Sequence, residues 1–307
     1  MEELIQLKSF PVETTLDILL QDKTTKKNII WATKSYAEFG EKYTDSFQMT
    51  KGALLGINPI LLQPRAFKAL EDQQQRTKSK AEVFTPSWIC NKMNNSTDEE
   101  WFGRKDVFNI EGEKSWKADQ HRIEFPEKKT WKKYVDSKRL EITCGEAPFI
   151  ISRYDASSGE IIPIQERIGQ LDRKLRVVGE NVNDEEEWLK WAYRAFQSVY
   201  GYEFQGDNLL IARVNLLMSF VDYLDDKWDR EPTVKELREI ANIISWNFWQ
   251  MDGLNDCVPL GVPEEATEQL TLFDFDDEPK EEKAPLCKIK DWRANSTDLF
   301  QNYKKEK

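Results

Sequence analysis

Histidine and paired cysteines are scarce in this chain of 307 residues. His121 is the single histidine, so a histidine-based triad, a histidine-rich metal site or a histidine general base has almost no raw material. The four cysteines form no Cys-x-x-Cys pair, which predicts reduced thiols in a cytoplasm. No apolar run approaches the roughly 20 residues of a membrane span, and the acidic start MEELIQLKSFPVE lacks the layout of a signal peptide. We therefore expect a cytoplasmic protein that binds neither a membrane nor a metal.

Basic residues are also in deficit, because 44 Lys and Arg stand against 55 Asp and Glu. Much of the net charge of −11 lies in residues 261–285, which predict a solvated acidic linker. A few apolar residues of this linker can dock on a partner: Leu270, Leu272, Phe273 and Phe275. The basic stretch 128–139 predicts either a solvated helix face or a phosphate contact. The chain lacks the strong positive charge of a protein that binds DNA by itself, so we expect any activity on DNA to depend on a partner.

Aromatic residues are abundant, with 16 Phe and 11 Trp, and they predict a packed globular protein. The length allows one large or two modest domains. We expect four parts: an N-terminal α+β extension over 1–80, a main domain over 81–260, the linker over 261–285, and a terminal strand with a tail over 286–307.

Strand and helix signals alternate in the main domain. A short strand runs from Arg139 into a turn at Gly145, and Asp184 opens an amphipathic helix with a capping-box-like pattern. The following segments predict a strand over 199–204, a buried helix from Asp207, a helix capped by Thr233 and Glu236, and a strand over 243–249. This order indicates an α/β fold with a parallel sheet and helical crossovers.

Three acidic residues fall where successive strands end: Glu141, Glu203 and Asp252. Ligands of open α/β sheets bind outside the carboxyl ends of the strands. A nucleoside cofactor suits this pattern, because a tight glycine turn admits the ligand, one acid accepts ribose hydroxyls and another accepts an adenine amino group. A strand-terminal acid alone is usually a surface residue. Three of them in this order indicate a site.

Four segments together resemble the motifs of gamma-class N6-adenine DNA methyltransferases. LEITCGEAPF (140–149) resembles the first motif, and VYGYEFQGDNLLIARVNLL (199–217) resembles the second. WQMDGL (249–254) resembles the third, and AEVFTPSWICNKMNN (81–95) resembles the amino-terminal motif, in the order that the family has. The whole chain also looks like the M subunits of bacterial restriction–modification systems.

The resemblance implies a Rossmann-like fold that binds S-adenosylmethionine. Phe84, Thr85 and Pro86 would meet the methionine moiety, although Thr85 and Pro86 also read as a helix N-cap followed by proline at the first helical position. The resemblance places the remaining contacts as follows: the turn around the methionine amine on Glu141, Cys144 and Gly145, the ribose on Glu203, the adenine face on Phe204 and the adenine amino group on Asp252.

Two features depart from the family pattern. The turn of the first motif has one glycine, with Glu146 and Ala147 where small residues are usual. In addition, Glu141 and Glu203 are farther apart in sequence than one strand–helix–strand crossover, which needs about 20–30 residues. We therefore expect an insertion at about 155–182 that leaves the sheet and re-enters it.

The catalytic motif of the family is absent. Its Asn-Pro-Pro-aromatic loop accepts hydrogen bonds from the target amino group and stacks on the flipped base. The chain has no Pro-Pro pair, and its single Asn-Pro, Asn58-Pro59, precedes the other motifs and predicts a turn.

These observations predict a split enzyme, an incomplete methyltransferase fold that methylates adenine N6 in specific double-stranded DNA. A second methyltransferase subunit would carry the catalytic loop and the target recognition. The alternative is a degenerate methyltransferase fold that acts as a scaffold or regulatory binding module. A DNA-binding protein without catalysis is a third possibility, which the charge disfavours.

Overall fold

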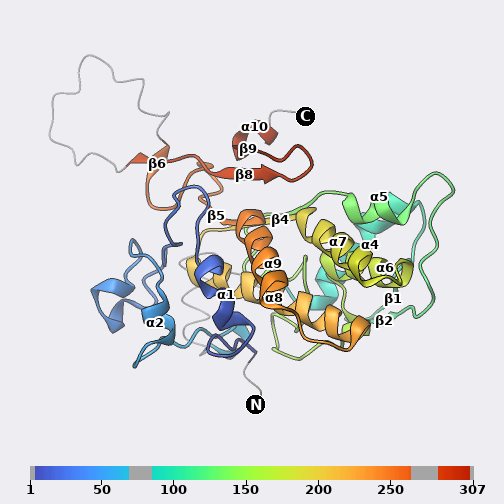
Figure 1. Cartoon of the computed structure of the whole chain (residues 1–307), viewed down its shortest axis with the longest axis horizontal. Helices are drawn as coiled ribbons and strands as arrows, with labels where there is room; N and C mark the ends of the chain where they lie inside the picture. The colour runs from blue at the N-terminus through green and yellow to red at the C-terminus, as the bar shows by residue number, and fades with distance from the viewer. Residues whose placement is uncertain (1–3, 69–84, 264–282, 305–307) are drawn as a thin grey trace.

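The computed structural model describes residues 4–68, 85–263 and 283–304 (Figure 1). Its α-helices are α1 (Val12–Leu19), α2 (Lys51–Leu55), α4 (Ser87–Phe102), α5 (Trp131–Asp136), α6 (Gln170–Asn181), α7 (Glu185–Gln197), α8 (Gly206–Trp228), α9 (Val234–Asn247) and α10 (Phe300–Lys304). Short 3-10 helices are η1 (Ala37–Phe39), η2 (Glu41–Tyr43), η3 (Arg65–Phe67) and η4 (Ile164–Glu166). The strands are β1 (Asn109–Gly112), β2 (Ser115–Ala118), β3 (Arg139–Glu141), β4 (Val199–Glu203), β5 (Phe248–Gln250), β6 (Val262–Pro263), β7 (Lys283–Ala284), β8 (Lys288–Asp291) and β9 (Ser296–Leu299).

The central sheet is parallel, and its strand order β3-β4-β5 follows the chain. Helices α6 and α7 connect β3 to β4, and α8 and α9 connect β4 to β5. Glu141 lies opposite Gly201 in the register, and Glu203 lies opposite Gln250. The chain therefore mixes helices with parallel strands, which is the coarse α/β arrangement that the sequence predicts.

Local capping signals position the helices as expected. The Asp184 side chain accepts the backbone N–H of Glu187 at 2.8 Å and starts α7. Thr233 and Glu236 form a reciprocal capping box that starts α9. Helix α8 is apolar on nearly all sides and lies buried along most of its length.

The strand predicted over 243–249 is wrong in its first five residues. Helix α9 continues to Asn247, and only Phe248–Gln250 forms β5. A short apolar run is compatible with either element, because strand and buried helix differ only in period. Leu237, Ile240 and Ile244 share the helical repeat set by the capping box, and this longer pattern includes the run.

Different elements pack on the two faces of the central sheet. The helices pack on the face that carries Val199 and Phe248. The β8–β9 hairpin and α10 lie on the other face, where Ile289 and Phe300 contact the aromatic side chains of β4 and β5 (Figure 1). The strand expected near 286–293 thus forms as β8, but it pairs only with β9 in a separate antiparallel sheet.

N-terminal residues are joined to the carboxyl ends of the central strands. Helix α1 packs on α9 (Figure 1). The Gln250 side chain accepts the Ile30 N–H and donates to the Ile30 carbonyl, both at 2.9 Å. The Gly206 N–H donates to the Trp31 carbonyl at 2.9 Å. Ile29 and Trp31 belong to the same hydrophobic core as α8 and α9.

Helix α6 lies in the segment expected to be an insertion, and two short strands lie at the ends of the acidic linker. Residues 155–182 end in α6, whose Leu171, Leu175 and Val178 lie in the main core against α7. Of the linker, 264–282 with its apolar residues lies outside the described residues, while its flanks pair as β6 and β7. None of the described helices is both long and apolar enough to cross a bilayer.

Candidate functional site

Glu141 ends β3 with its carboxylate turned into the protein. Its side chain is 8 % exposed. Oε1 accepts the Phe149 N–H at 3.4 Å, and Oε2 accepts the Ile150 N–H at 3.2 Å. Glu141 therefore holds the far end of the first motif, since Phe149 and Ile150 follow its glycine turn.

Glu203 ends the neighbouring strand β4 and is 6 % exposed. Its Oε2 accepts the Gly145 N–H at 2.9 Å, and its Oε1 accepts the Gln205 N–H at 3.2 Å. The Cys144 N–H donates to the Tyr202 carbonyl at 2.8 Å. The turn that follows β3 is thus joined by hydrogen bonds to the end of β4.

The turn of the first motif has left-handed backbone. Thr143, Gly145 and Ala147 have φ of 45°, 54° and 64°. Glycine accepts this conformation freely, but β-branched Thr143 does not, and such residues cost about 1–3 kcal/mol and cluster at binding sites. The hydrogen bonds of Cys144 and Gly145 to β4 hold the strained turn in place.

The two strand-end carboxyls interact electrostatically. Burial raises the pKa of Glu141 to about 8, and the nearby charge of Glu203 contributes in the same direction. Burial and the two carboxyls also raise the pKa of the Cys144 thiol well above its ordinary value. A cation bound beside Glu141 would favour the ionised form of its carboxyl.

Glu146, one of the departures in the first motif, has a structural role that the sequence analysis missed. It is buried, and its carboxylate accepts the Arg65 N–H at 2.7 Å and the Tyr154 hydroxyl at 2.6 Å. Asn215 of the second motif donates to the same Tyr154 hydroxyl at 2.9 Å. No local signal marks this role, because Arg65 lies 81 residues away in sequence.

Asp252 lies two residues beyond β5 and is half-buried. Its carboxylate accepts the Leu254 N–H and the Asn255 side-chain N–H, both at 2.9 Å, and so closes its own turn. Glu141 pairs with Gly201, so Glu203 lies two residues beyond the level of Glu141. Glu203 pairs with Gln250, so Asp252 lies two residues beyond the level of Glu203. The three acids therefore occupy one edge of the sheet at successive levels along the strand direction.

Gln250, to which the sequence analysis gave no role, ends β5 and pairs with Glu203 in the register. Its amide nitrogen donates to the Phe204 carbonyl at 2.8 Å as well as to Ile30. Phe204 is half-buried beside it. A glutamine at the end of a predicted strand can be recognised in the sequence. The two segments that its side-chain amide joins cannot be predicted from the sequence.

The sequence predicts Thr85 as the N-cap of a helix and Pro86 as its first residue, and the structure of α4 shows that this assignment is wrong. Phe84 lies outside the described residues. Pro86, not Thr85, is the N-cap, and the Asp155 carboxylate accepts the Ser87 N–H at 2.6 Å. A distant acid thus supplies the cap, because proline has no side-chain acceptor.

Cys90 shows how near α4 comes to the strand ends. Burial raises the pKa of its thiol, and the charges of Glu141 and Asp155 add to that effect. The Asn94 side chain on the same helix donates to the Phe149 carbonyl at 2.9 Å, which joins the amino-terminal motif to the first motif. The structure thus brings together the described residues of the amino-terminal, first and second motifs.

Asn58-Pro59 stands apart from this arrangement. Asn58 is exposed, and both residues follow α2 without regular structure. Pro59 lines a shallow cavity with residues of the N-terminal segment, among them Leu7 and Leu54. The structure has no helix or strand at Asn58-Pro59, which agrees with the turn that the sequence predicts.

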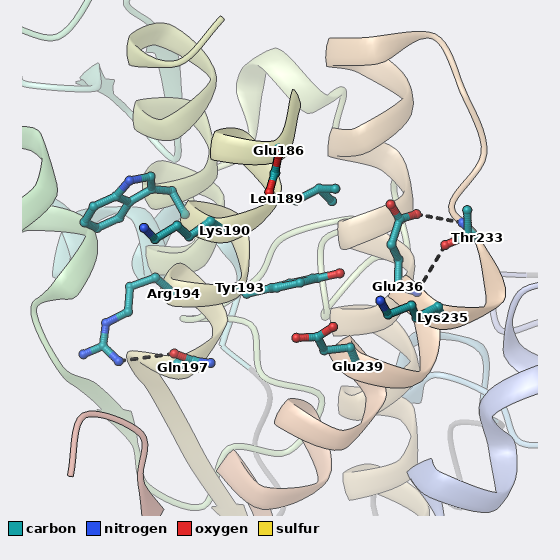
Figure 2. Close-up of a pocket in the computed structure, with 11 residues that line it drawn as sticks. Glu186, Leu189, Lys190, Tyr193, Arg194, Gln197, Thr233, Lys235, Glu236 and Glu239 are labelled. Atoms are coloured by element: carbon teal, nitrogen blue, oxygen red, sulfur yellow. Dashed lines mark hydrogen bonds between the residues drawn. The ribbon is translucent and has the colours of Figure 1, made fainter. Parts of the chain in front are cut away.

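A groove of about 630 Å³ lies between α7 and α9 (Figure 2). The Tyr193 ring extends from α7 toward Glu236 and Glu239 of α9 (Figure 2). Burial and these two acids raise the pKa of the Tyr193 hydroxyl. The groove carries none of the predicted site residues, and Glu236 is already used in the cap of α9.

Comparison of the chain with protein-family models, with curated proteins and with solved structures found no match.

Proposed function

We propose that this chain is the S-adenosylmethionine-binding subunit of a site-specific DNA adenine-N6 methyltransferase in a restriction–modification system. The catalytic Asn-Pro-Pro-aromatic loop belongs to a partner chain. The observation that carries the proposal is the junction of Glu141, Gly145 and Glu203 at the carboxyl ends of two adjacent parallel strands. The proposed fold is a Rossmann-like methyltransferase fold that lacks its final strands.

The residues present fit this cofactor. Its ammonium group would lie beside Glu141, whose pKa is raised by burial and by the nearby charge of Glu203, so a bound cation would stabilise the carboxylate there. Gly145 lets the backbone approach closely, and Glu203 offers acceptors to the ribose hydroxyls. Asp252, at the next level of the sheet edge, would accept the adenine amino group. When bound, the cofactor supplies an electrophilic methyl group.

The unpaired edge of β3 supports the proposal that a partner chain binds here. Strand β3 pairs with β4 on one side only, so its other edge has no strand among the described residues. Leu140 on this strand is 47 % exposed, and Ile142, which follows its last residue, is 63 % exposed. Leu140 also lines a cavity of about 170 Å³, together with Tyr200 and Trp249 among others. Unpaired edges and exposed apolar surface are typical of interfaces.

The direct test is calorimetry of the full chain with S-adenosylmethionine, S-adenosylhomocysteine and adenosine. We expect binding of the first, weaker binding of the neutral thioether, and weaker binding still of the bare nucleoside. Methyl transfer to mixed-sequence DNA is then assayed with and without the product of the neighbouring gene. Absence of cofactor binding would remove the proposal.

The competing function is a degenerate methyltransferase fold that serves as a scaffold. It is supported by the backbone N–H groups that already occupy the carboxylates of Glu141 and Glu203, since these bonds alone explain two buried acids. The two functions are separated by the same calorimetry. A scaffold retains its melting temperature in S-adenosylmethionine, whereas a ligand that binds the folded state raises it.

A further inference from the structure

A second cavity, of about 620 Å³, lies outside the strand-end site. It is open to solvent and is bordered by the start of α4, the β1–β2 hairpin, the loop that begins at Asp155, and η4. The side chains that matter for its chemistry are Trp88, Trp116, Lys114, Asp155, Glu160 and Glu166.

Two indole rings line this cavity without a stacking partner. Trp88 and Trp116 are each half-buried, and neither contacts another ring or a cation within the described residues. The other tryptophans all have such a partner. The Trp116 indole N–H donates to the Glu166 carbonyl at 2.8 Å, which fixes the ring against η4. Fixed aromatic faces that border a cavity are available to a ligand.

The walls of the cavity carry an excess of negative charge. Burial alone would raise the pKa of Asp155, but hydrogen bonds from Ser157 and Ser87 hold it below its ordinary value. The exposed carboxylates of Glu160 and Glu166 make no ion pair with any described residue. Lys114 is the one basic residue of this wall. The wall therefore repels phosphate and attracts cations.

Hydrogen bonds to Asp155 hold one part of the wall in place. The Asp155 carboxylate caps α4 through Ser87 and at the same time accepts the N–H groups of Ser157 and Ser158 at 2.8 and 2.9 Å. One acid thus ties the loop to the helix. A ligand would meet a largely preformed surface, which lowers the entropic cost of binding.

We propose that this cavity binds the arginine or lysine side chains of a basic segment of a partner polypeptide. Trp88 and Trp116 offer cation–π faces, and Glu160 and Glu166 offer ion pairs to the same cations. The proposal stands on this cavity alone and does not depend on cofactor binding at the strand ends.

The test uses the full chain and a fluorescein-labelled ten-residue Arg-Gly peptide, with a citrulline-Gly peptide of equal length as the neutral probe. Fluorescence anisotropy is measured for the wild type, for Trp88→Leu/Trp116→Leu and for Glu160→Gln/Glu166→Gln. We expect the arginine peptide alone to bind, and each double variant to weaken it about tenfold or more. Trp246→Leu and Glu38→Gln/Glu41→Gln remove similar groups elsewhere and should leave binding unchanged.

Thermal melting of each variant, followed by circular dichroism, tests whether the variant is folded. If the tryptophan variant binds as tightly as the wild type, the attraction is general charge and the proposal fails. It also fails if neither peptide binds. Binding of a short single-stranded oligonucleotide in preference to the peptide, lost in the tryptophan variant, would overturn it in favour of a nucleobase pocket.

Discussion

Gly145 and Glu203, 58 residues apart in the chain, are joined by a hydrogen bond of 2.9 Å from the glycine amide to Oε2. The bond connects the turn after β3 with the end of β4 at the edge where α/β sheets bind ligands. It is the contact on which the proposed cofactor site depends.

Glu203→Ala should weaken S-adenosylmethionine binding at least tenfold, because it removes the acceptor for the ribose hydroxyls. Hydrogen bonds to charged groups contribute about 1.5–3 kcal/mol each. The same change leaves the Gly145 and Gln205 N–H groups without their acceptor, so the melting temperature should fall too. Calorimetry and thermal melting are compared with Asp17→Asn on the surface of α1. Unchanged affinity in Glu203→Ala would exclude the ribose role.

The stability of the free chain should fall as pH rises from about 4.5 to 8 through Glu141. Its pKa is about 8 in the folded chain against 4.5 for the ordinary group, so the folded state binds the proton more tightly. Its contribution is therefore complete below pH 4.5 and is lost as pH rises through 8, with a slope of at most about 1.4 kcal/mol per pH unit. Urea unfolding from pH 5 to 8 measures it, and Glu141→Gln should flatten the curve relative to the wild type. Parallel curves for the two proteins would contradict the shift.

Gly206→Ala should destabilise the fold by about 1–3 kcal/mol. A Cβ there would lie 2.0 Å from the Ile30 carbonyl oxygen, so the backbone that joins the N-terminal residues to α8 must move. Gly179→Ala in α6 is the matched control, because its Cβ meets nothing within 4 Å. In a helix interior that change should stabilise by about 0.5–1 kcal/mol. Chemical denaturation distinguishes the two, and equal effects would refute the close approach.

The chain alone should transfer no methyl group to DNA, and the partner chain should restore transfer. Acceptors around the target amino group and a platform for the extruded base are both lacking in the motifs that the sequence contains. Their loss corresponds to about a thousandfold or more in rate. Labelled cofactor and mixed-sequence DNA are incubated with the purified chain, with and without the neighbouring gene product. Robust transfer by the chain alone would refute the split enzyme and direct attention to Asn58-Pro59.

Leu140→Glu/Ile142→Glu should prevent assembly with that partner while cofactor binding by the isolated chain persists. Leu140 on β3 and Ile142 just after it are both exposed in the monomer, so charge there costs the free chain little. An interface that buries them would reject two carboxylates. Size-exclusion chromatography of the co-expressed chains is the measurement, with Ile110→Glu on the exposed β1 strand as control. A complex that forms equally well would place the interface elsewhere.

Part of this architecture follows from neighbouring residues alone. Asp184 and the pair Thr233 and Glu236 start their helices because capping involves residues within one turn. The apolar pattern of α8 predicts its burial, and the turn at Gly145 follows from the one residue type that adopts positive φ without strain. The same local reading fails at 243–247, where a short apolar run is compatible with strand and helix alike.

By itself, the sequence determined the starts of α7 and α9, the alternation of strands and helices around the central sheet, and the location of Glu141 and Glu203 where their strands end. Only the tertiary structure decided that Asp155 caps α4, that Glu146 receives Arg65 and Tyr154, and that Gln250 clasps Ile30. The physical reason is range. Caps and periodic patterns act over a few residues, whereas a buried polar group must find its partner wherever the fold places one, here 68, 81 and 220 residues away.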